Sequence, residues 1–329
     1  EPAPRNTGPA LAAVATALAA EHADAVLLVL PSDHLVSADA AYHDAIDAGV
    51  AAARQGHMVT FGVTPTYPET GYGYVAAGEP VSNGAYGVAR FVEKPPMEEA
   101  ARMIAAGNHF WNAGFFALQA HALLEELSRV APDVAEAAEA AVAGGRRERD
   151  GLRLAEDAFA RAPDISIDYA LFERTDRAAV VPVASPWSDV GSWRAFWEAT
   201  ERDAAGVATA GDVLAIDTRD TLVLSNTAKV VTLGVENLAV IATADSVLVC
   251  RLDRAQDVKD VVAALKRDGA DRLCHVSPTA YRPWGGYSSI LKHQRFQVKH
   301  LFVEPGRQLS LQKHHHRSEH WIVVRGTAA

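Results

Sequence analysis

The chain has 329 residues, more than one hydrophobic core usually organises, so two or three structural units are expected. It carries 41 acidic and 31 basic side chains, which give a formal net charge of -10 at pH 7. Because nucleic-acid polymers and anionic membrane surfaces bind basic faces, this charge argues against both as partners. A small anionic substrate is still compatible with it, since metal ions and a few local cations can neutralise such a ligand.

Cysteine use and hydropathy indicate a cytoplasmic protein without membrane segments. Cys250 and Cys274 are the two cysteines, and their spacing suits neither a disulfide framework nor a zinc knuckle. No stretch approaches the roughly 20 apolar residues that span a bilayer, and no secretion signal opens the chain. The sequence begins with Glu1 rather than Met and ends within a strand-like pattern, so we expect both ends to be cut.

Residues 1–205 predict an α/β domain with a mostly parallel sheet, because short apolar runs alternate with alanine-rich helical stretches. The predicted strands are 25–30, 58–63, 88–92, 115–118 and 179–183. The predicted helices are 10–20, 40–54, 98–106 and 134–144, followed by a charged run, 146–150, that is expected to be a solvated surface. Ligands of such a sheet bind outside the carboxyl ends of its strands.

Two further units are expected after this domain. In residues 206–270, short β-branched runs punctuated by turn residues predict a small β-solenoid or meander, closed by a helix at 257–267. Its predicted strands are 213–216, 221–224, 229–232, 238–241 and 246–249. Residues 271–329 begin as a polar linker, and from Tyr281 their alternating aromatic and β-branched residues, with a turn at 305–306 and an apolar run at 321–324, indicate the start of an all-β unit.

Two acidic loops predict a magnesium site. Asp33 follows the apolar run 26–30, and Asp189 lies between the strand that ends near Val183 and a helix that begins near Ser192. Carboxylate oxygens are ligands that Mg²⁺ prefers, and such a metal keeps positions for substrate phosphates and water. The alternative is that Asp33 caps the next helix and Asp189 forms an ordinary turn. His34 is expected to form a local hydrogen bond rather than to bind metal.

Three further segments suit a polyhydroxylated, phosphorylated ligand. Gly73, in the run Gly-Tyr-Gly-Tyr, allows close approach to the backbone. Glu93 and Lys94 follow another strand and offer a carboxylate for hydroxyls and an ammonium for a phosphate. The Asn112 amide can both donate and accept hydrogen bonds. The alternatives are a surface ion pair for the first two charges and a structural turn for Asn112.

Polar residues also precede the first predicted helix. Arg5, Asn6 and Thr7 gather side chains near helix-end amides, where an anion or a base edge can bind. The carboxylate of Glu1 can accept both the N1–H and the exocyclic amine of guanine, which makes a purine site chemically sensible. An ordinary helix cap by Thr7 is the alternative.

Near the end of the chain, the residues follow the spacing of the first cupin motif, with Gln in place of its first His. The positions are Gly306, Gln312, His314, Glu319 and Gly326. The two-residue period of a strand places Gln312 and His314 on one face, and Glu319 can return on the partner strand. These three side chains are predicted to share a divalent transition metal such as zinc, cobalt or manganese, the alternative being a solvated turn.

Taken in order, these motifs resemble the bacterial mannose-1-phosphate guanylyltransferases, including the kind that also carries a type II phosphomannose isomerase. The resemblance covers almost the whole chain. It rests on Arg5-Asn6-Thr7, Pro31-Ser32-Asp33-His34, Phe91-Val92-Glu93-Lys94-Pro95, Trp111-Asn112-Ala113-Gly114, Ser166-Ile167-Asp168-Tyr169-Ala170 and Trp187-Ser188-Asp189-Val190-Gly191-Ser192-Trp193. The fold it implies is a Rossmann-like, GT-A-like nucleotidyltransferase domain, a β-solenoid-like domain and the beginning of a cupin β-barrel.

The resemblance also implies an activity and roles for residues. Mannose 1-phosphate would attack the α-phosphate of GTP to give GDP-mannose and pyrophosphate, coupled in the complete protein to mannose-6-phosphate isomerisation. By this likeness Glu1, Arg5, Asn6, Thr7, Gly73, Glu93, Asn112 and Asp168 bind substrate, Lys94 faces the sugar phosphate, and Asp33 and Asp189 hold Mg²⁺. Positioning and charge neutralisation at the α-phosphate should dominate catalysis. A homo-oligomer is compatible with the resemblance.

Family members begin with a glycine-rich phosphate loop that bears Arg and is followed by Lys, and the sequence that begins at Glu1 is expected to lack this loop. The remaining cupin strands and the fourth metal ligand are expected to be missing as well. Three alternatives stay open: a nucleotidyltransferase for another hexose 1-phosphate, a non-catalytic sugar-nucleotide sensor, and a cupin isomerase for which the first domain is a scaffold. The last predicts that Asp33→Ala leaves activity intact whereas His314→Ala abolishes it.

Overall fold

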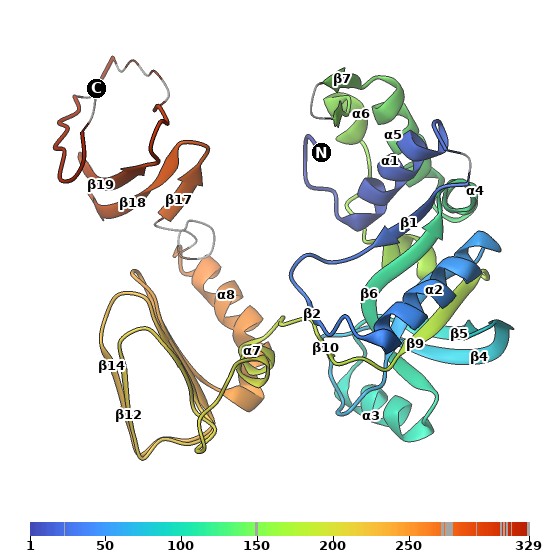
Figure 1. Ribbon diagram of the computed structural model, residues 1–329, viewed down its shortest axis with the longest axis horizontal. Coiled ribbons are helices and arrows are strands. Elements are labelled where there is room, and N and C mark those ends of the chain that lie inside the picture. Colours follow the sequence, from blue (N-terminus) through green and yellow to red (C-terminus); the bar gives the residue numbers. More distant parts are fainter. Residues whose placement is uncertain are drawn as a thin grey trace. The chain divides into compact units, whose positions relative to one another are not determined.

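The computed structural model describes the chain except for residues 23, 149–150, 271–272, 274–278, 294, 310, 312, 314, 317 and 328–329. The chain forms two compact units, Glu1–Thr200 and Glu201–Ala329 (Figure 1). Within the described part, no helix has the length and apolar character needed to cross a membrane.

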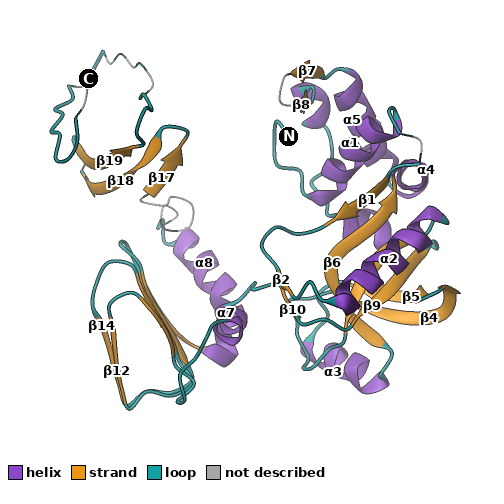
Figure 2. Cartoon of the chain, viewed as in Figure 1, coloured by secondary structure: helices purple, strands orange, loops and turns teal. Residues whose placement is uncertain are grey.

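A six-stranded sheet forms the centre of the first unit, in the order β1-β6-β3-β9-β5-β4 (Figure 2). Its strands are β1 (Val26–Val29), β3 (Met58–Val63), β4 (Tyr74–Ser82), β5 (Ala85–Val92), β6 (His109–Gln119) and β9 (Ala178–Val183). Strands β1, β3, β4 and β9 run in one direction, as a mostly parallel sheet requires. However, β5 and β6 run the opposite way between them, so β3 and β9 are the parallel neighbours and the other ladders are antiparallel.

The strands predicted from the sequence include only part of β6 and omit β4, and the predicted helices omit α4. Strand β6 begins at His109, whereas the predicted strand begins at residue 115. The prediction is too short because Asn112 and Gly114 interrupt the apolar pattern of the strand. Strand β4 contains Gly78 and Pro80, residues that weaken strand predictions. Helix α4 (Ala120–Val130) follows β6 directly, without a turn residue that marks its start.

Helices cover both faces of the sheet. On one face, α1 (Thr7–Ala19), α4 and α5 (Pro132–Ala143) pack against Phe116 and Leu118 of β6. On the other face, α2 (Ala40–Arg54) packs against Phe115 and Ala117 of the same strand. Alternate residues of β6 thus enter opposite cores, as the two-residue strand period requires. The result is a three-layer α/β domain, in which the sheet lies between two layers of helices.

Shorter elements complete the first unit. They are β2 (Leu35–Val36), α3 (Met97–Ala106), β7 (Arg146–Glu148), β8 (Gly151–Arg153), α6 (Glu156–Phe159), the π-helix η1 (Asp168–Phe172), β10 (Trp187–Ser188) and α7 (Trp193–Ala199). The first three residues of the charged run expected at 146–150 form β7, the first strand of the β7–β8 hairpin, and their side chains are exposed. The Ser192 side chain caps α7, as the sequence predicts.

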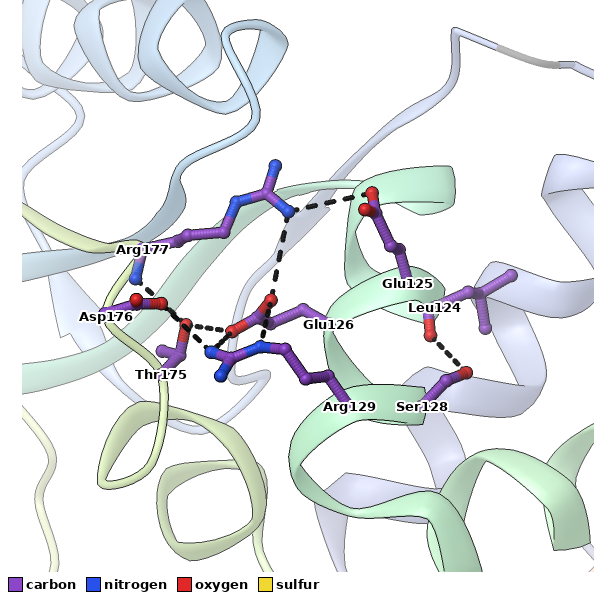
Figure 3. Close-up of polar contacts among 8 residues, drawn as sticks. All are labelled: Leu124, Glu125, Glu126, Ser128, Arg129, Thr175, Asp176 and Arg177. Carbon is purple, nitrogen blue, oxygen red and sulfur yellow. Dashed lines mark hydrogen bonds and ion pairs between the residues drawn. The ribbon is translucent and has the colours of Figure 1, made fainter.

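A buried carboxylate joins α4 to the segment that leads into β9. The Glu126 side chain is 2% exposed, and its oxygens accept hydrogen bonds from the Arg129 guanidinium and from Thr175 Oγ1 (Figure 3). Arg177, directly before β9, is a second cation, and its guanidinium lies 3.8 Å from the Glu126 carboxylate. The segment after η1 is therefore held to α4 by charge-assisted hydrogen bonds.

The second unit begins with a parallel β-solenoid. Its strands are β11 (Ala208–Ala210), β12 (Val213–Ile216), β13 (Leu222–Ser225), β14 (Val230–Leu233), β15 (Leu238–Ala242) and β16 (Val247–Arg251). Strands β11, β13 and β15 form parallel ladders on one side of the coil, and β12 pairs in parallel with β14 on another. Antiparallel β16, η2 (Leu252–Asp257) and α8 (Val258–Arg267) follow. The predicted solenoid is confirmed.

An antiparallel meander follows, made of β17 (Thr279–Arg282), β18 (Gly285–Lys292) and β19 (Gln297–Val303). A side chain at Gly285 would lie 2.1 Å from the Phe302 carbonyl oxygen, so only glycine permits this ladder. The apolar run 321–324 was expected to be a strand, yet it is exposed and forms none. No described strand pairs with it, and a strand needs such a ladder.

Candidate active site

A short ladder brings the two acidic loops together. Strand β2 pairs with β10 so that Leu35 lies opposite Ser188. Asp33 is two residues before Leu35, and Asp189 directly follows Ser188. These loops follow β1 and β9, two strands of the same direction, so both carboxylates reach the edge of the sheet that the sequence predicts. Asp33 itself is exposed.

The carboxylate of Asp189 has two donors on one oxygen. Its Oδ1 accepts a hydrogen bond from the Tyr72 hydroxyl at 2.7 Å and another from the Gly191 amide at 2.9 Å. Burial, followed by the bond to Asp189, raises the pKa of Tyr72 far above its ordinary value, so the phenol remains a donor. The next residue, Val190, has a φ of 50°, which is rare for a β-branched side chain and indicates a loop held under strain.

His34 is engaged locally. Its Nδ1 lies 3.3 Å from Trp187 Nε1, and its ring contacts those of Trp187 and Phe115. The Trp187 indole N–H donates this hydrogen bond. His34 thus contacts the loop that carries Asp189 and Phe115 of β6, in keeping with its expected local role.

Register explains a second cluster. Tyr74 pairs with Val92 of β5 and also with Trp111 of β6. Both ladders are antiparallel, so the residue before Tyr74 lies next to the residues that follow Val92 and Trp111. This brings Gly73, Glu93 and Asn112 together, and the backbone N–H of Asn112 donates a hydrogen bond to the backbone carbonyl of Gly73 at 2.8 Å.

Gly73 leaves room that any other residue would fill. A side-chain carbon there would lie 2.5 Å from Glu93 Oε2 and 3.3 Å from Asn112 Cβ. The Glu93 carboxylate is 12% exposed and lies 3.4 Å from the Lys94 ammonium, which is 61% exposed. Lys94 has a φ of 50°. The carboxylate is therefore largely shielded from solvent, whereas the ammonium that pairs with it remains exposed.

The side-chain amide of Asn112 is fixed by three hydrogen bonds. Its Oδ1 accepts from the Thr60 hydroxyl at 2.7 Å and from the Gly114 amide at 3.2 Å. Its Nδ2 donates to Asp168 Oδ1 at 2.8 Å. This pattern sets which end of the amide carries oxygen, and one N–H of the amide is not used by these bonds.

Burial raises the pKa of both Glu93 and Asp168. For Glu93 the negative charge of Asp168 adds to the effect of burial, and the Lys94 ammonium opposes it. For Asp168 the hydrogen bond from Asn112 opposes burial. Two acidic groups with raised pKa values beside a positioned amide are typical of a functional site.

The segment before α1 is tied to the residues around Asp168. The Thr7 hydroxyl accepts a hydrogen bond from the Ile167 amide at 2.9 Å. The cap of the helix is Asn6, whose φ is 63° and whose side chain accepts from the Thr7 amide, so the alternative of a cap by Thr7 is wrong. Arg5 donates to the Ala160 carbonyl at 2.5 Å, and its Nε is buried without a partner in the described structure.

Other predicted positions are less constrained. Glu1 is exposed at the start of the chain. In the second unit, Gln312 and His314 lie outside the described residues, and Glu319 is exposed. The three-ligand cupin site therefore stays a prediction.

The donors at the sheet edge fit Mg²⁺. In the described part of the chain, no group of three or more His, Cys, Asp or Glu could hold a metal. Mg²⁺ is usually bound by one or two carboxylates together with substrate phosphates and water, rather than by a cage of protein ligands. The pair Asp33 and Asp189 supplies hard oxygen ligands of this kind on loops that the β2–β10 ladder brings to one edge.

Sequence reasoning missed Tyr72 and Thr60, each of which donates to a predicted site residue. Tyr72 had a signal, since it lies between Gly71 and Gly73. Thr60 had none, because a threonine within an apolar strand is expected to be an ordinary core residue.

Comparison with known proteins agrees with this geometry. The sequence matches the nucleotidyl transferase family over residues 1–206, the MannoseP isomerase/GMP-like β-helix domain over 211–265 and the mannose-6-phosphate isomerase C-terminal domain over 269–329. It is 48% identical to the xanthan biosynthesis protein XanB of Xanthomonas campestris and 44% identical to the mannose-1-phosphate guanylyltransferase ManC of Salmonella typhimurium, covering all of this chain and 69% of each relative. The chain belongs to the mannose-1-phosphate guanylyltransferase family.

A further relative and two solved structures support the same family and fold. A mannose-1-phosphate guanylyltransferase of Sinorhizobium fredii is 48% identical over the whole chain, which spans 64% of that protein. A Thermus thermophilus structure described as a mannose-1-phosphate geranyltransferase superposes with a TM-score of 0.70 at 37% identity, covering 81% of this chain and 77% of the other. A Helicobacter pylori mannose-6-phosphate isomerase has a TM-score of 0.51 at 32% identity, covering 56% and 71%. The expected fold classes are confirmed.

Proposed function

We propose that the protein transfers a guanylyl group from GTP to α-D-mannose 1-phosphate, giving GDP-mannose and pyrophosphate. The observation that carries this proposal is the chain of neighbouring residues that runs from Asp189, through Tyr72 and Gly73, to Glu93 and Asn112. It has carboxylates for a cation at one end and oriented hydroxyl-binding groups at the other. A sugar phosphate and a nucleotide α-phosphate need this pair of environments side by side.

At the sugar end, Glu93 and Asn112 bind mannose hydroxyls. The bonds from Thr60 and to Asp168 orient the Asn112 amide before substrate arrives, so little reorganisation is needed on binding. Asp168 lies behind this amide and shapes the pocket. The exposed Lys94 ammonium faces the sugar phosphate.

At the phosphate end, Asp33 and Asp189 hold Mg²⁺, which supplies charge neutralisation at the phosphates when bound. The residues of the chain then contribute in-line positioning, since no side-chain nucleophile is required. Glu1, Arg5, Asn6 and Thr7 bind the nucleotide. The bond between Thr7 and Ile167 supports this, because it holds the start of α1 beside the segment that carries Asp168.

Product analysis of the purified protein tests the proposal. With Mg²⁺ and mannose 1-phosphate, GTP should yield GDP-mannose and pyrophosphate in chromatography, whereas ATP, UTP and CTP should yield at least about tenfold less product. Glucose 1-phosphate in place of mannose 1-phosphate distinguishes the alternative of another hexose-1-phosphate nucleotidyltransferase. Binding of GDP-mannose without turnover by the complete protein would instead support a sugar-nucleotide sensor.

Isomerisation of mannose 6-phosphate to fructose 6-phosphate is the second candidate function. The match of residues 269–329 to the mannose-6-phosphate isomerase C-terminal domain supports it. We propose that Gln312, His314 and Glu319 hold a transition metal such as zinc, cobalt or manganese. His314→Ala should abolish isomerisation and leave guanylyl transfer intact, and Asp33→Ala should do the reverse. Loss of all activity in His314→Ala alone would favour the isomerase with a scaffold domain.

The remaining proposals concern organisation and location. Three domains, 1–205, 206–270 and 271–329, act on small phosphorylated ligands in the cytoplasm rather than on nucleic acid or membrane. Self-association is supported by Leu214, Ile216, Val231 and Leu233, exposed apolar residues paired across β12 and β14. Light scattering after size-exclusion chromatography measures the oligomeric state.

A further inference from the structure

The two oxygens of the Asp189 carboxylate have different surroundings. Oδ1 accepts hydrogen bonds from the Tyr72 hydroxyl at 2.7 Å and the Gly191 amide at 2.9 Å. For Oδ2, the described residues supply no hydrogen bond. A methyl group at Gly191 would lie 2.5 Å from Oδ2, so the loop keeps this oxygen clear because residue 191 lacks a side chain.

The Tyr72 side chain, which donates the hydrogen bond to Asp189 Oδ1, is held in place by its neighbours. Its ring, 8% exposed, makes edge contacts with Trp111 at 5.2 Å and Trp187 at 5.3 Å between ring centroids. Its backbone carbonyl accepts from the Lys94 amide at 3.2 Å. A phenylalanine would fill the same space between the two indoles, so packing alone does not explain the hydroxyl.

The hydroxyl has a directional role instead. It donates to a carboxylate 117 positions away in the chain, on a loop whose residue Val190 has a left-handed backbone. A free Asp side chain can rotate and present either oxygen. Two donors on Oδ1 remove that freedom and leave Oδ2 as the oxygen that receives no hydrogen bond from the described residues.

We propose that Tyr72 is a positioning residue that orients Asp189 so that its Oδ2 binds the divalent cation. This inference deepens the proposed function and rests on it for the identity of the reaction, although the cation binding it describes can be measured separately. Removing the hydroxyl deletes one hydrogen bond to a charged group, so cation affinity should fall by about tenfold.

The test is a titration of the full chain with Mn²⁺, followed by electron paramagnetic resonance of the free ion. Tyr72→Phe should raise the Kd for Mn²⁺ by about tenfold, approaching the effect of Asp189→Asn. Tyr74→Phe is the matched control: it deletes another buried phenol hydroxyl, which bonds to the Glu69 amide at 2.9 Å and not to Asp189. Its Kd should stay within about twofold of the parent value.

Gly191→Ala keeps the inference testable if Tyr72→Phe does not fold. Residue 191 is exposed, so the added methyl group threatens Oδ2 rather than the core. This variant should also raise the Kd for Mn²⁺ by at least about tenfold. Near-ultraviolet circular dichroism establishes folding for each variant.

Two outcomes overturn the inference: an unchanged Kd in both folded variants, or an equal rise in Tyr74→Phe. Turnover separates this result from the proposed function. If the parent protein makes no GDP-mannose but the Mn²⁺ affinities change as expected, the reaction assignment fails and the positioning role stands. If turnover is normal and neither Mn²⁺ affinity changes, only the positioning role fails.

Discussion

Replacing Glu126 by glutamine tests whether the buried carboxylate stabilises the first unit. Glutamine has nearly the same shape and keeps an acceptor for Thr175, but it removes the charge that faces Arg129 and Arg177 (Figure 3). The Arg129 contact joins atoms 2.5 Å apart, at a carboxylate that is 2% exposed. Glu126→Gln therefore isolates the charge from the packing.

The magnitude follows from these surroundings. A hydrogen bond to a charged group contributes about 1.5–3 kcal/mol. The Arg129 side chain is 54% exposed, so water compensates part of its loss and the lower half of that range applies. We expect Glu126→Gln to lower the free energy of unfolding by about 2 kcal/mol. For a unit of this size, that is a fall in melting temperature of about 4–8 °C.

Glu125→Gln is the matched control. Its carboxylate is 66% exposed and lies 3.6 Å from the same Arg177, so neutralising it should cost about 0.5 kcal/mol or less. Differential scanning calorimetry of both variants measures the difference. Equal melting temperatures for Glu126→Gln and Glu125→Gln would refute the reasoning, because burial would then have no effect on the value of the charge.

The same pair has a predictable pH dependence. Burial by itself raises the pKa of Glu126, but hydrogen bonds from Arg129 and Thr175 outweigh it and hold the pKa below its ordinary value. A carboxyl group whose pKa is lowered on folding stabilises the fold above its unfolded pKa, about 4.3, and loses that contribution as the pH falls through the folded pKa. The gap between Glu126→Gln and the parent protein should therefore close below about pH 4.

Three further predictions concern the site. Gly73→Ala places a methyl group 2.5 Å from Glu93 Oε2 and should raise the KM for mannose 1-phosphate at least about tenfold in steady-state kinetics, with little change for GTP. Thr60→Val removes one donor to Asn112 Oδ1 and should raise the same KM about five- to tenfold, with kcat less affected, because only two of the three hydrogen bonds that orient the amide remain. Asp168→Asn removes a buried carboxyl group whose pKa is raised by burial. Such a group stabilises the fold while it is protonated at low pH, and this contribution is lost as the pH rises through the folded pKa. At pH 7 the variant should therefore be about 0.5–1 kcal/mol more stable in urea unfolding, yet less active.

Element positions could be predicted where the hydrophobic pattern is uninterrupted. Strand β3 and helix α2 have the predicted bounds, because the apolar run and the amphipathic repeat begin and end where the elements do. Strand β4 and the first half of β6 could not be found this way. Their glycine, proline and asparagine residues are tolerated because each strand pairs with neighbours from distant parts of the chain.

The chemical groups of the site can be read from the amino-acid sequence: acidic loops after Val29 and Val183, the Glu93-Lys94 pair, and the order in which they occur. The orientation of these groups depends on the folded chain. Asp189 presents one oxygen because Tyr72, far away in the chain, donates to the other. A two-residue strand period tells which face a side chain occupies, but the partner on that face is set by strand register, which depends on the packing of the whole sheet.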